Sequence, residues 1–420
     1  MKVCVIGSGG REHALAWRLS ISPSVTKVYA IPGSAAMSDC AELVGIDWQQ
    51  RDHLISFLKD NQVDLVVVGP EAPLVAGLAD VLNKAGIPVF GPSKAAAQLE
   101  GSKVFAKDLM KKYNIPTAAY GVFHKVDEAK AFIAQTGAPI VVKADGLAAG
   151  KGVVVAMTID EANVAVEDML SGNRFGDAGS TVVIEEFMEG EEASLLAFVD
   201  GKTVVPMIAS QDHKRIFDGD KGPNTGGMGT YAPAPVLTDA LRDAAMKTIL
   251  EPMVAAMEKE GMPYVGCLYA GLMITDEGPK VVEFNARFGD PETQVVLPLL
   301  DSDLGEIMMA CAKGTLTSNM VKWKDSSAAC VILASKGYPE TSSKGDVISG
   351  DIKQYDTTIV FHSGTKLVGE NYVTNGGRVL GVVGLGKDLR TALDRAYERI
   401  EHIDFEGMQY RTDIGAKAFK

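Results

Sequence analysis

The sequence lacks the features that would place it among membrane, secreted or nucleic-acid-binding proteins. No apolar run approaches the roughly 18 residues that a membrane-spanning helix requires. The five cysteines, at positions 4, 40, 267, 311 and 330, are scattered and mostly lie in apolar runs, which predicts reduced core residues and not a disulfide framework or zinc site. The net charge of −13 includes no basic cluster, which argues against nucleic acid or an anionic membrane as the main partner. The chain enters a strand pattern at once, without the regions of a signal peptide, so we expect a cytoplasmic protein.

The sequence has the ordinary composition of a globular protein, with 46% apolar and 23% charged residues. Strand-like and helix-like patterns alternate over the first 100 residues. The strand-like runs are 2–6, 27–30, 63–68 and 88–90, and the helix-like runs are 12–19, 54–59 and 74–84. Such alternation predicts an open parallel α/β sheet covered by helices on both faces.

The rest of the chain predicts further α/β and α+β parts. A helix at 103–118 leads into a small α+β unit at 119–187, and mixed strands and helices follow to about residue 315. The polar segment 211–235 is predicted to be irregular. Polarity rises near residue 325, before predicted strands at 328–334 and 379–383 and a helix at 389–402. We therefore predict domains at 1–101, 102–325 and 326–420.

The segment PIVVKADGLAAGKG, residues 139–152, is the most informative part of the chain. A strand-like run delivers Lys143 into a loop that carries Gly146, Gly150, Lys151 and Gly152. Backbone without Cβ atoms can approach an anion closely, and its N–H groups can converge on a phosphate. A second strand-like run follows, so this is not a Walker loop, which must open a helix. The pattern predicts a polyphosphate-binding loop, and the alternative is an exposed hairpin tip.

Two strand ends in the first 100 residues also have the composition of ligand sites. In VIGSGGREH, Gly9, Gly10 and Arg11 lie at a helix start, where N–H groups favour a phosphate. A dinucleotide site is disfavoured because the G-x-G-x-x-G spacing and the acidic residue about 20 positions later are missing; a purely structural turn stays open. His13 is either packed or catalytic. In GPEAPL, Glu71 either accepts sugar hydroxyls or simply starts a helix.

The run KVVEFNAR, residues 280–287, predicts a strand with one polar face. Alternation places Glu283, Asn285 and Arg287 on the same face. Such groups need partners if they are buried. Carboxylate and amide oxygens suit Mg²⁺, and an arginine suits phosphate oxygens. We therefore predict a metal and phosphate site here; a solvated strand face is the alternative.

The polar segment contains a third candidate binding region, QDHKR followed by GPNTGGMG. Asp212 has the charge to hold an ammonium group. Lys214, Arg215 and the amides of 226–229, including Gly227, have the donors to hold a carboxylate or phosphate. A flexible surface loop is the alternative.

Taken together, several motifs closely resemble the glycinamide ribonucleotide synthetase family of ATP-grasp enzymes: GSGGREHALAW, GPEAPL, FGPSKAAAQLEGSK, VVKADGLAAGKGV, QDHKR, GPNTGGMG, LYAGLM and EFNARFGDPETQ. The resemblance extends to about residue 300 and resumes weakly at RTDIG, residues 411–415. It implies an ATP-grasp fold with a mobile lid at about 119–188, an N-terminal open-sheet domain and a small C-terminal α/β domain. It also implies ATP-dependent ligation of glycine to 5-phosphoribosylamine through glycyl phosphate, in de novo purine biosynthesis.

The resemblance further implies roles for individual residues. The ATP site would comprise Lys103, Lys143, Gly146, Gly150, Lys151, Gly152, Glu185, Glu186, Phe187, Met188 and Glu192, with adenine at 185–188 and ribose at 192. Glu283 and Asn285 would hold Mg²⁺ or Mn²⁺. The substrates would contact Gly9, Gly10, Arg11, Glu71, Asp212, Lys214, Gly227 and Arg287, and the catalytic residues would be Arg287, Asp212 and Lys143. Only small-molecule partners are implied, with no nucleic acid or membrane, for a monomer or weak dimer.

One departure from the wider ATP-grasp pattern leaves the number of metal ions open. Many members carry another metal-binding carboxylate on the strand before E-x-N, whereas this chain has YAGLM at 269–273. Three alternatives remain. These are another ATP-grasp ligase or carboxylase acting on a different acid, a nucleotide sensor without chemistry, and an NAD-dependent oxidoreductase. The polar face at 283–287 argues against the sensor, and the glycine spacing argues against the oxidoreductase.

Overall fold

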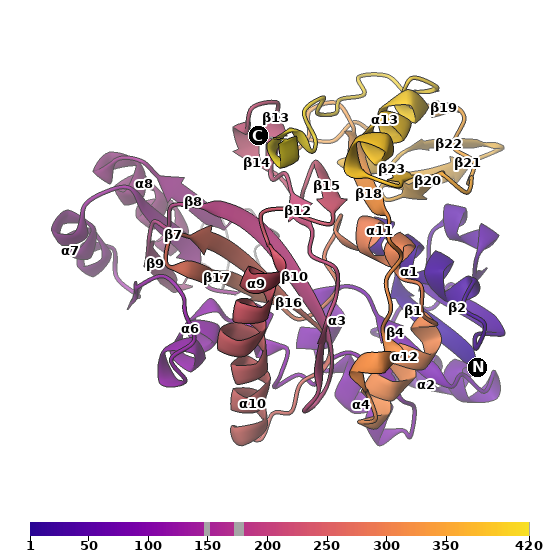
Figure 1. Ribbon diagram of the computed structural model, residues 1–420, viewed down its shortest axis with the longest axis horizontal. Helices are drawn as coiled ribbons and strands as arrows, with labels where there is room; N and C mark the ends of the chain where they lie inside the picture. Colours follow the sequence, from indigo (N-terminus) through magenta and orange to yellow (C-terminus); the bar gives the residue numbers. More distant parts are fainter. Residues whose placement is uncertain (147–151, 172–179, 420) are drawn as a thin grey trace.

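The computed structural model describes residues 1–146, 152–171 and 180–419, and its N-terminal part is the predicted parallel sheet (Figure 1). The strand order is β3-β2-β1-β4-β5, with every pair parallel. The strands are β1 (Lys2–Gly7), β2 (Lys27–Pro32), β3 (Glu42–Leu43), β4 (Leu65–Val68) and β5 (Val89–Phe90), and the first helices are α1 (Gly10–Ser20) and α2 (Arg51–Asp60). Strands β1 and β4 are continuous apolar runs because both of their faces are buried.

Two predicted helices differ from the observed ones. The helix expected at 74–84 is divided into α3 (Glu71–Val75) and α4 (Leu78–Lys84). Between them Gly77 has a φ of +81°, which a continuing helix does not allow. The helix expected at 103–118 is α6 (Lys103–Lys112), preceded by the short α5 (Gln98–Gly101). It ends before Asn114, whose φ is +54°, and the following Pro116 disfavours helical backbone at the residue before it.

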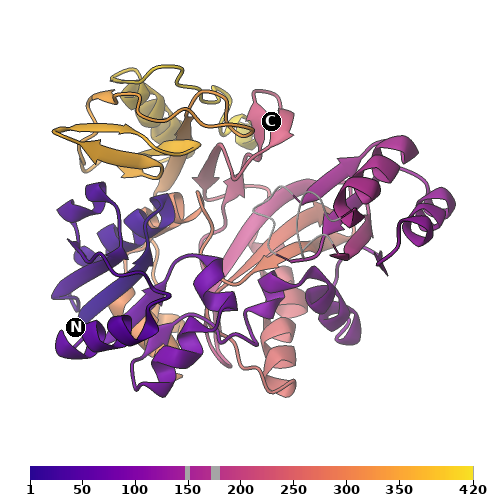
Figure 2. The same ribbon diagram turned by 180° about the vertical axis from the view of Figure 1, so that it is seen from behind.

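The middle of the chain forms two antiparallel sheets. The smaller one, here called the lid sheet, has the order β6-β9-β7-β8 and carries α7 and α8, which project away from the rest of the molecule (Figure 1 and Figure 2). Its elements are β6 (Tyr120–Phe123), α7 (Val126–Thr136), β7 (Ile140–Ala144), β8 (Val153–Ala156), α8 (Ile159–Leu170) and β9 (Val182–Glu186). The lid sheet reaches the larger sheet, since Lys143 Nζ donates to the Val282 carbonyl at 3.0 Å.

The larger sheet has the order β11-β10-β16-β17 and is covered on both faces. One face of β10 and β16 packs with α9 and α10, and the other packs with α12 and the N-terminal sheet, which explains the long apolar runs of these strands. The elements are β10 (Glu191–Asp200), β11 (Val204–Pro206), α9 (Asp239–Ala245), α10 (Glu251–Lys259), β16 (Val265–Thr275), β17 (Gly278–Asn285), α11 (Thr293–Val296) and α12 (Leu304–Lys313).

The third large sheet combines the polar segment with the C-terminal part, in the order β12-β15-β18-β23-β20. The prediction of an irregular segment at 211–235 is therefore wrong. The segment contains β12 (Gln211–Asp212), β13 (Arg215–Phe217), β14 (Lys221–Asn224) and β15 (Gly229–Ala232). These strands are short, and β15 pairs with β18, about 100 residues further along the chain, so no local pattern reveals them. The C-terminal elements are β18 (Ser327–Ala334), β19 (Ser349–Gly350), β20 (Thr358–His362), β21 (Thr365–Val368), β22 (Asn371–Thr374), β23 (Arg378–Gly386), α13 (Leu389–Ile400) and β24 (Ile403–Asp404).

All five cysteines are free, and four of them are buried, as the sequence predicted. Within the described ranges, no helix combines the length and hydropathy needed to cross a bilayer.

Candidate active site

A cleft of about 950 Å³ lies where the three parts of the chain meet. Most of the predicted site residues line it: Arg11, Glu71, Lys103, Lys143, Gly146, Gly152, Glu185, Glu186, Phe187, Met188, Glu192, Asp212, Lys214, Glu283, Asn285 and Arg287. Gly9, Gly10 and Gly227 are outside its lining, and Gly150 and Lys151 lie outside the described residues.

Two lysines converge on one carboxylate at the lid end of the cleft. Lys143 of β7 and Glu185 of the neighbouring β9 are joined by a 2.9 Å contact between Nζ and Oε2. Lys107 of α6 lies 3.1 Å from the same oxygen. Burial lowers the pKa of Lys107 to about 8, and Glu185 offsets only part of this effect. Lys107 was not predicted from the sequence, although it lies one helical turn after Lys103.

The start of α6 is tied to the predicted phosphate loop. A carboxylate oxygen of Asp145 accepts the backbone N–H of Lys103 at 2.6 Å and that of Val104 at 3.2 Å. The Lys103 ammonium donates to the Gly146 carbonyl at 2.8 Å. Gly146 has a φ of +89°, a conformation that favours glycine. Asp145, a residue the sequence analysis did not select, therefore fixes the first part of the loop against α6.

The residues after β9 form an apolar wall of the cleft. Phe187 and Met188 line it together with Val155 and Met157 of the lid sheet region. The backbone of Glu186 is fixed by its N–H, which donates to the Ala119 carbonyl at 2.9 Å. An apolar wall with nearby backbone polar groups suits a flat heteroaromatic ring.

The polar face predicted for β17 is present in the structure. Asn285 Nδ2 and Glu283 Oε1 are 3.5 Å apart, and an Arg287 N–H reaches Asn285 Oδ1 at 3.4 Å. Burial alone would raise the pKa of Glu283, but Lys214, Lys143 and other cations outweigh it and hold the pKa below its ordinary value. Glu283 is therefore a carboxylate at neutral pH. The amide nitrogen of Asn285 faces it, and the amide oxygen of Asn285 faces Arg287.

Arg287 joins β17 to the N-terminal sheet. Its Nη2 lies 2.8 Å from Glu100 Oε1, and its Nε lies 3.4 Å from Glu71 Oε2. Glu71 also lies 4.0 Å from Arg11. Burial would raise the pKa of Glu71, yet Arg287 and Arg11 together lower it. Glu100 was not predicted, because a lone glutamate in a short helix gives no local signal for a partner 187 residues away.

The polar segment supplies the opposite wall of the cleft. Lys214 Nζ lies 2.8 Å from Glu192 Oε2. Burial raises the pKa of Asp212 well above its ordinary value, and the neighbouring Glu292 raises it further. Gly227 packs directly on this group, since a Cβ atom there would lie 2.8 Å from Asp212 Oδ1. Gly227 thus contributes to the site by making room for Asp212.

The glycine turn after β1 accommodates a side chain of the protein itself. Glu12 accepts the Gly9 N–H at 2.7 Å. A Cβ atom at Gly7 or Gly69 would lie 2.4 Å or 2.2 Å from atoms of the Glu12 side chain. His13, for which packing and catalysis were both open, is packed: it is 2% exposed, and its Nδ1 accepts the His362 N–H at 3.0 Å.

The C-terminal part also contributes to the cleft. Arg378 of β23 lies 3.2 Å from Asp290 Oδ2 and donates to the Gly226 carbonyl at 2.7 Å. Lys417 lines the same cleft. Neither residue lies in a motif that the sequence analysis selected, and both reach the cleft only through long-range packing.

The lid sheet, the larger sheet and the lysine-rich cleft define an ATP-grasp enzyme. Comparisons with known proteins identify the family. Residues 1–100 match the N domain of phosphoribosylglycinamide synthetase, residues 101–293 its ATP-grasp (A) domain and residues 328–417 its C domain. The chain belongs to the phosphoribosylglycinamide synthetase family, as its motifs indicated.

Individual relatives agree with this assignment. Phosphoribosylamine–glycine ligases from Halalkalibacterium halodurans and Neisseria meningitidis serogroup A are each 53% identical to the chain; the matches cover 100% of it and 97% and 99% of those proteins. The crystal structure of phosphoribosylamine–glycine ligase from Thermotoga maritima has a TM-score of 0.87 at 34% identity, covering 99% of this chain and 100% of that one. The biotin carboxylase domain of the Hydrogenobacter thermophilus 2-oxoglutarate carboxylase has a TM-score of 0.74 at 16% identity, covering 97% and 91%, and shares the fold.

Proposed function

We propose that the cleft joins glycine to 5-phosphoribosylamine with conversion of ATP to ADP and phosphate, giving glycinamide ribonucleotide in de novo purine biosynthesis. One observation carries the proposal: the lysine pair Lys103 and Lys143 and the polar face from Glu283 to Arg287 line a single cavity. A nucleotide and an acceptor can therefore meet there. The full-length relatives named as phosphoribosylamine–glycine ligases support this choice of substrates.

The two steps of the reaction explain why the lysine pair and the polar face of β17 belong to one cleft. A carboxylate is a poor electrophile, so a glycine carboxylate oxygen first attacks the γ-phosphorus of ATP and ADP leaves. The nitrogen of phosphoribosylamine then attacks the carbonyl carbon of glycyl phosphate, phosphate leaves, and the nitrogen loses a proton. Phosphoryl transfer requires mainly positioning and charge neutralisation from the protein. Holding the amine and the acyl phosphate together can supply about 7–11 kcal/mol of the barrier.

The proposal assigns the parts of the cleft as follows. Lys103, Lys143 and the loop 146–152 bind the ATP phosphates, and the wall at 185–188 binds adenine. Asp212, Arg287 and the polar segment position glycine and the transferring phosphoryl group. Glu71 and Arg11 in the cleft lining bind phosphoribosylamine, together with the adjacent turn at Gly9 and Gly10, which lies outside that lining. The lid at 119–188 excludes water from glycyl phosphate, which hydrolyses readily.

Glu283 and Asn285 fit a divalent cation. Their side chains carry an ionised carboxylate and an amide oxygen, the donors that Mg²⁺ or Mn²⁺ prefers. The Asn285 amide would turn to present its oxygen, because its nitrogen faces Glu283 in the structure. Among the residues that the structure describes, no group of three or more His, Cys, Asp or Glu side chains could hold a metal. Bound there, the ion would supply charge neutralisation at the phosphates.

In this proposal the chain is a cytoplasmic enzyme whose substrates are small molecules. It is a monomer or weak dimer, and neither nucleic acid nor membrane is a partner. Its domains are 1–101, 102–325 and 326–420.

An ADP-release assay with each substrate omitted in turn tests the proposal. We expect ADP release only when ATP, a divalent cation, glycine and phosphoribosylamine are all present. Release that continues without glycine, or that requires a different acid, would assign the cleft to another ATP-grasp reaction. Tight binding of ATP with no release of ADP under any of these conditions would instead indicate a nucleotide sensor.

A further inference from the structure

Arg411 is a buried cation whose motif has no role in the reaction described above. It belongs to RTDIG, residues 411–415, and only 1% of its side chain is exposed. In both ribbon views the C-terminal end of the chain lies beside β13 and β14 (Figure 1 and Figure 2).

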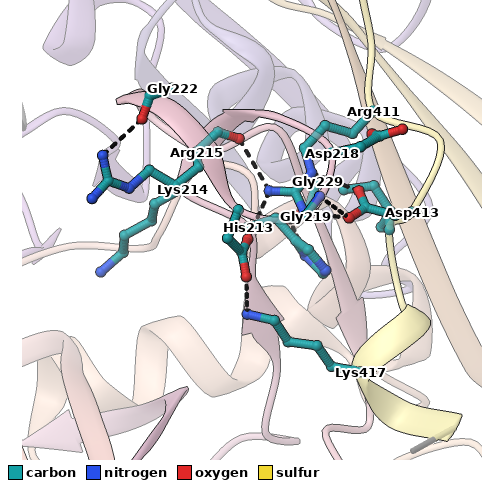
Figure 3. A network of polar contacts seen from close by, with 12 residues as sticks. His213, Lys214, Arg215, Asp218, Gly219, Gly222, Gly229, Arg411, Asp413 and Lys417 are labelled. Atoms are coloured by element: carbon teal, nitrogen blue, oxygen red, sulfur yellow. Dashed lines mark hydrogen bonds and ion pairs between the residues drawn. The ribbon is translucent and has the colours of Figure 1, made fainter. Parts of the chain in front are cut away.

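The guanidinium group of Arg411 joins the C-terminal segment to the β13–β14 hairpin. Its Nε and Nη2 donate to the two carboxylate oxygens of Asp413 at 2.7 and 2.8 Å. Its Nη1 donates to the Arg215 carbonyl at 3.1 Å and to Asp220 Oδ1 at 2.9 Å. Figure 3 shows Arg411 and Asp413 together on one side of the hairpin. We call residues 411–417 and their contacts with the hairpin the C-terminal clasp.

Further contacts complete the C-terminal clasp. The Gly219 N–H donates to Asp413 at 2.8 Å, and the Thr412 N–H donates to Asp218 at 2.9 Å. Lys417 Nζ lies 2.6 Å from Asp220 Oδ2. Outside the hairpin, the Gly415 N–H donates to Nε2 of His213, the residue after β12, at 3.4 Å.

The hairpin needs such a support because its own structure is small. Strands β13 and β14 form a separate two-stranded sheet with an irregular register. An isolated two-stranded hairpin is marginally stable in water. Its apolar anchor is limited to Ile216, which packs with Met228 and Ala334, whereas Phe217 is 56% exposed.

The hairpin also borders the cleft, which the clasp residues Asp220 and Lys417 line as well. Lys214, Arg215 and Asn224 line the cleft, and Lys214 pairs with Glu192 across it. In Figure 3 the side chains of Lys214 and Arg215 point away from Arg411 and Asp413. A displacement of the hairpin would therefore move the cleft-facing lysine directly.

We propose that Arg411 is a positioning residue for the ligase reaction: through the C-terminal clasp it holds the β13–β14 hairpin so that Lys214 stands in the cleft. This inference rests on the proposed function of the cleft. A rigid guanidinium fork suits the role, because it binds Asp413 bidentately while still reaching the hairpin backbone.

The test compares Arg411→Gln with Arg399→Gln. Arg399 is a matched control: it is also largely buried in the C-terminal part, lies 2.5 Å from Asp351 and donates to the Lys353 carbonyl, but does not contact the hairpin. Kinetic constants for all three substrates are measured below the unfolding temperature of both variants. Hydrogen exchange of the amides at 215–224 is followed in the same samples.

We expect Arg411→Gln to lower kcat by about 10- to 100-fold, as a displaced positioning group does. Exchange at 215–224 should accelerate only in this variant, and Arg411→Lys should recover part of kcat. Equal losses of kcat in Arg411→Gln and Arg399→Gln, or unchanged exchange in Arg411→Gln, would overturn the inference. If Arg411→Gln does not fold, Asp218→Ala replaces it, because this exposed carboxylate holds Thr412 from outside. The exchange measurement does not need turnover, so an inactive wild type would refute the proposed function separately.

Discussion

Individual charges in the cleft act through partners that lie far away in the sequence. The residues that were predicted, such as Lys143 and Glu283, lie on strands whose alternation is visible locally. Lys107 and Glu100 were missed because their importance comes from Glu185 and Arg287, which are contributed by other elements. A sequence pattern predicts the face that a side chain occupies, but not the charged residue from another element that it will contact.

Glu283→Gln tests the metal assignment with a change in a single side chain. The substitution keeps the shape of the side chain and removes its charge, so we expect kcat to fall by about 100-fold or more, as for loss of a group that stabilises developing charge. The dependence of ADP release on Mg²⁺ concentration should weaken. The variant should still fold, with a lower unfolding temperature, because the cations that lower the Glu283 pKa lose their charged partner.

Glu277→Gln is the matched control for this variant. Glu277 precedes the same strand and pairs with Lys280 at 2.6 Å, but its side chain is 77% exposed. We expect wild-type kinetics from it. Near-normal turnover in Glu283→Gln would contradict the metal assignment.

Among the secondary-structure elements, local pattern predicted those with a clear apolar or amphipathic run. Strands β1, β2, β4 and β5 of the first sheet, the lid strands flanking the phosphate loop and α13 all follow from periodicity and glycine or proline breaks, whereas the two-residue β3 was not predicted. Local pattern did not predict β12 and β15, because these strands of two and four residues depend on pairing within the C-terminal sheet. The positions of Arg378 and Lys417 in the cleft follow from the same long-range packing.

Gly227→Ala tests how the polar segment holds Asp212. Gly227 has a φ of +115°, and a Cβ atom there would lie 2.5 Å from Pro291 Cδ and 2.8 Å from Asp212 Oδ1. Backbone strain of about 1–3 kcal/mol should lower the unfolding free energy, and displacement of Asp212 should raise KM for glycine.

Gly278→Ala separates these two effects. Gly278 has a similar φ of +109°, but a Cβ atom there would meet nothing within 4 Å. We therefore expect a smaller loss of unfolding free energy, from backbone strain alone, with unchanged KM. If both variants raise KM equally, the contact with Asp212 is not the cause.

At the scale of the whole molecule, buried histidines lie where the C-terminal part joins the other parts. His13 of α1 accepts the N–H of His362 on β20. His213, beside β12, shares a hydrogen bond with Gly229 and accepts the N–H of Gly415. Burial lowers the pKa of His13 to about 3 and those of His213 and His362 to about 4, from an ordinary value of 6.5. All three are therefore neutral in the folded protein.

This arrangement predicts a loss of stability in mild acid. Between pH 6.5 and about 4 each buried histidine is protonated in the unfolded chain but stays neutral in the folded chain. Each one therefore lowers the unfolding free energy by about 1.4 kcal/mol per pH unit as the pH falls.

Replacing one of these histidines removes its contribution to this pH dependence. His362→Gln, which keeps a polar group near Thr365, should therefore lose less stability than the wild type on acidification. Between pH 7 and pH 5 the difference in unfolding free energy between the two proteins should change by about 2 kcal/mol in favour of the variant, as measured by urea unfolding. The same substitution at the exposed His53 is the control, and an equal pH response in His362→Gln and the wild type would show that His362 is not a neutral buried group.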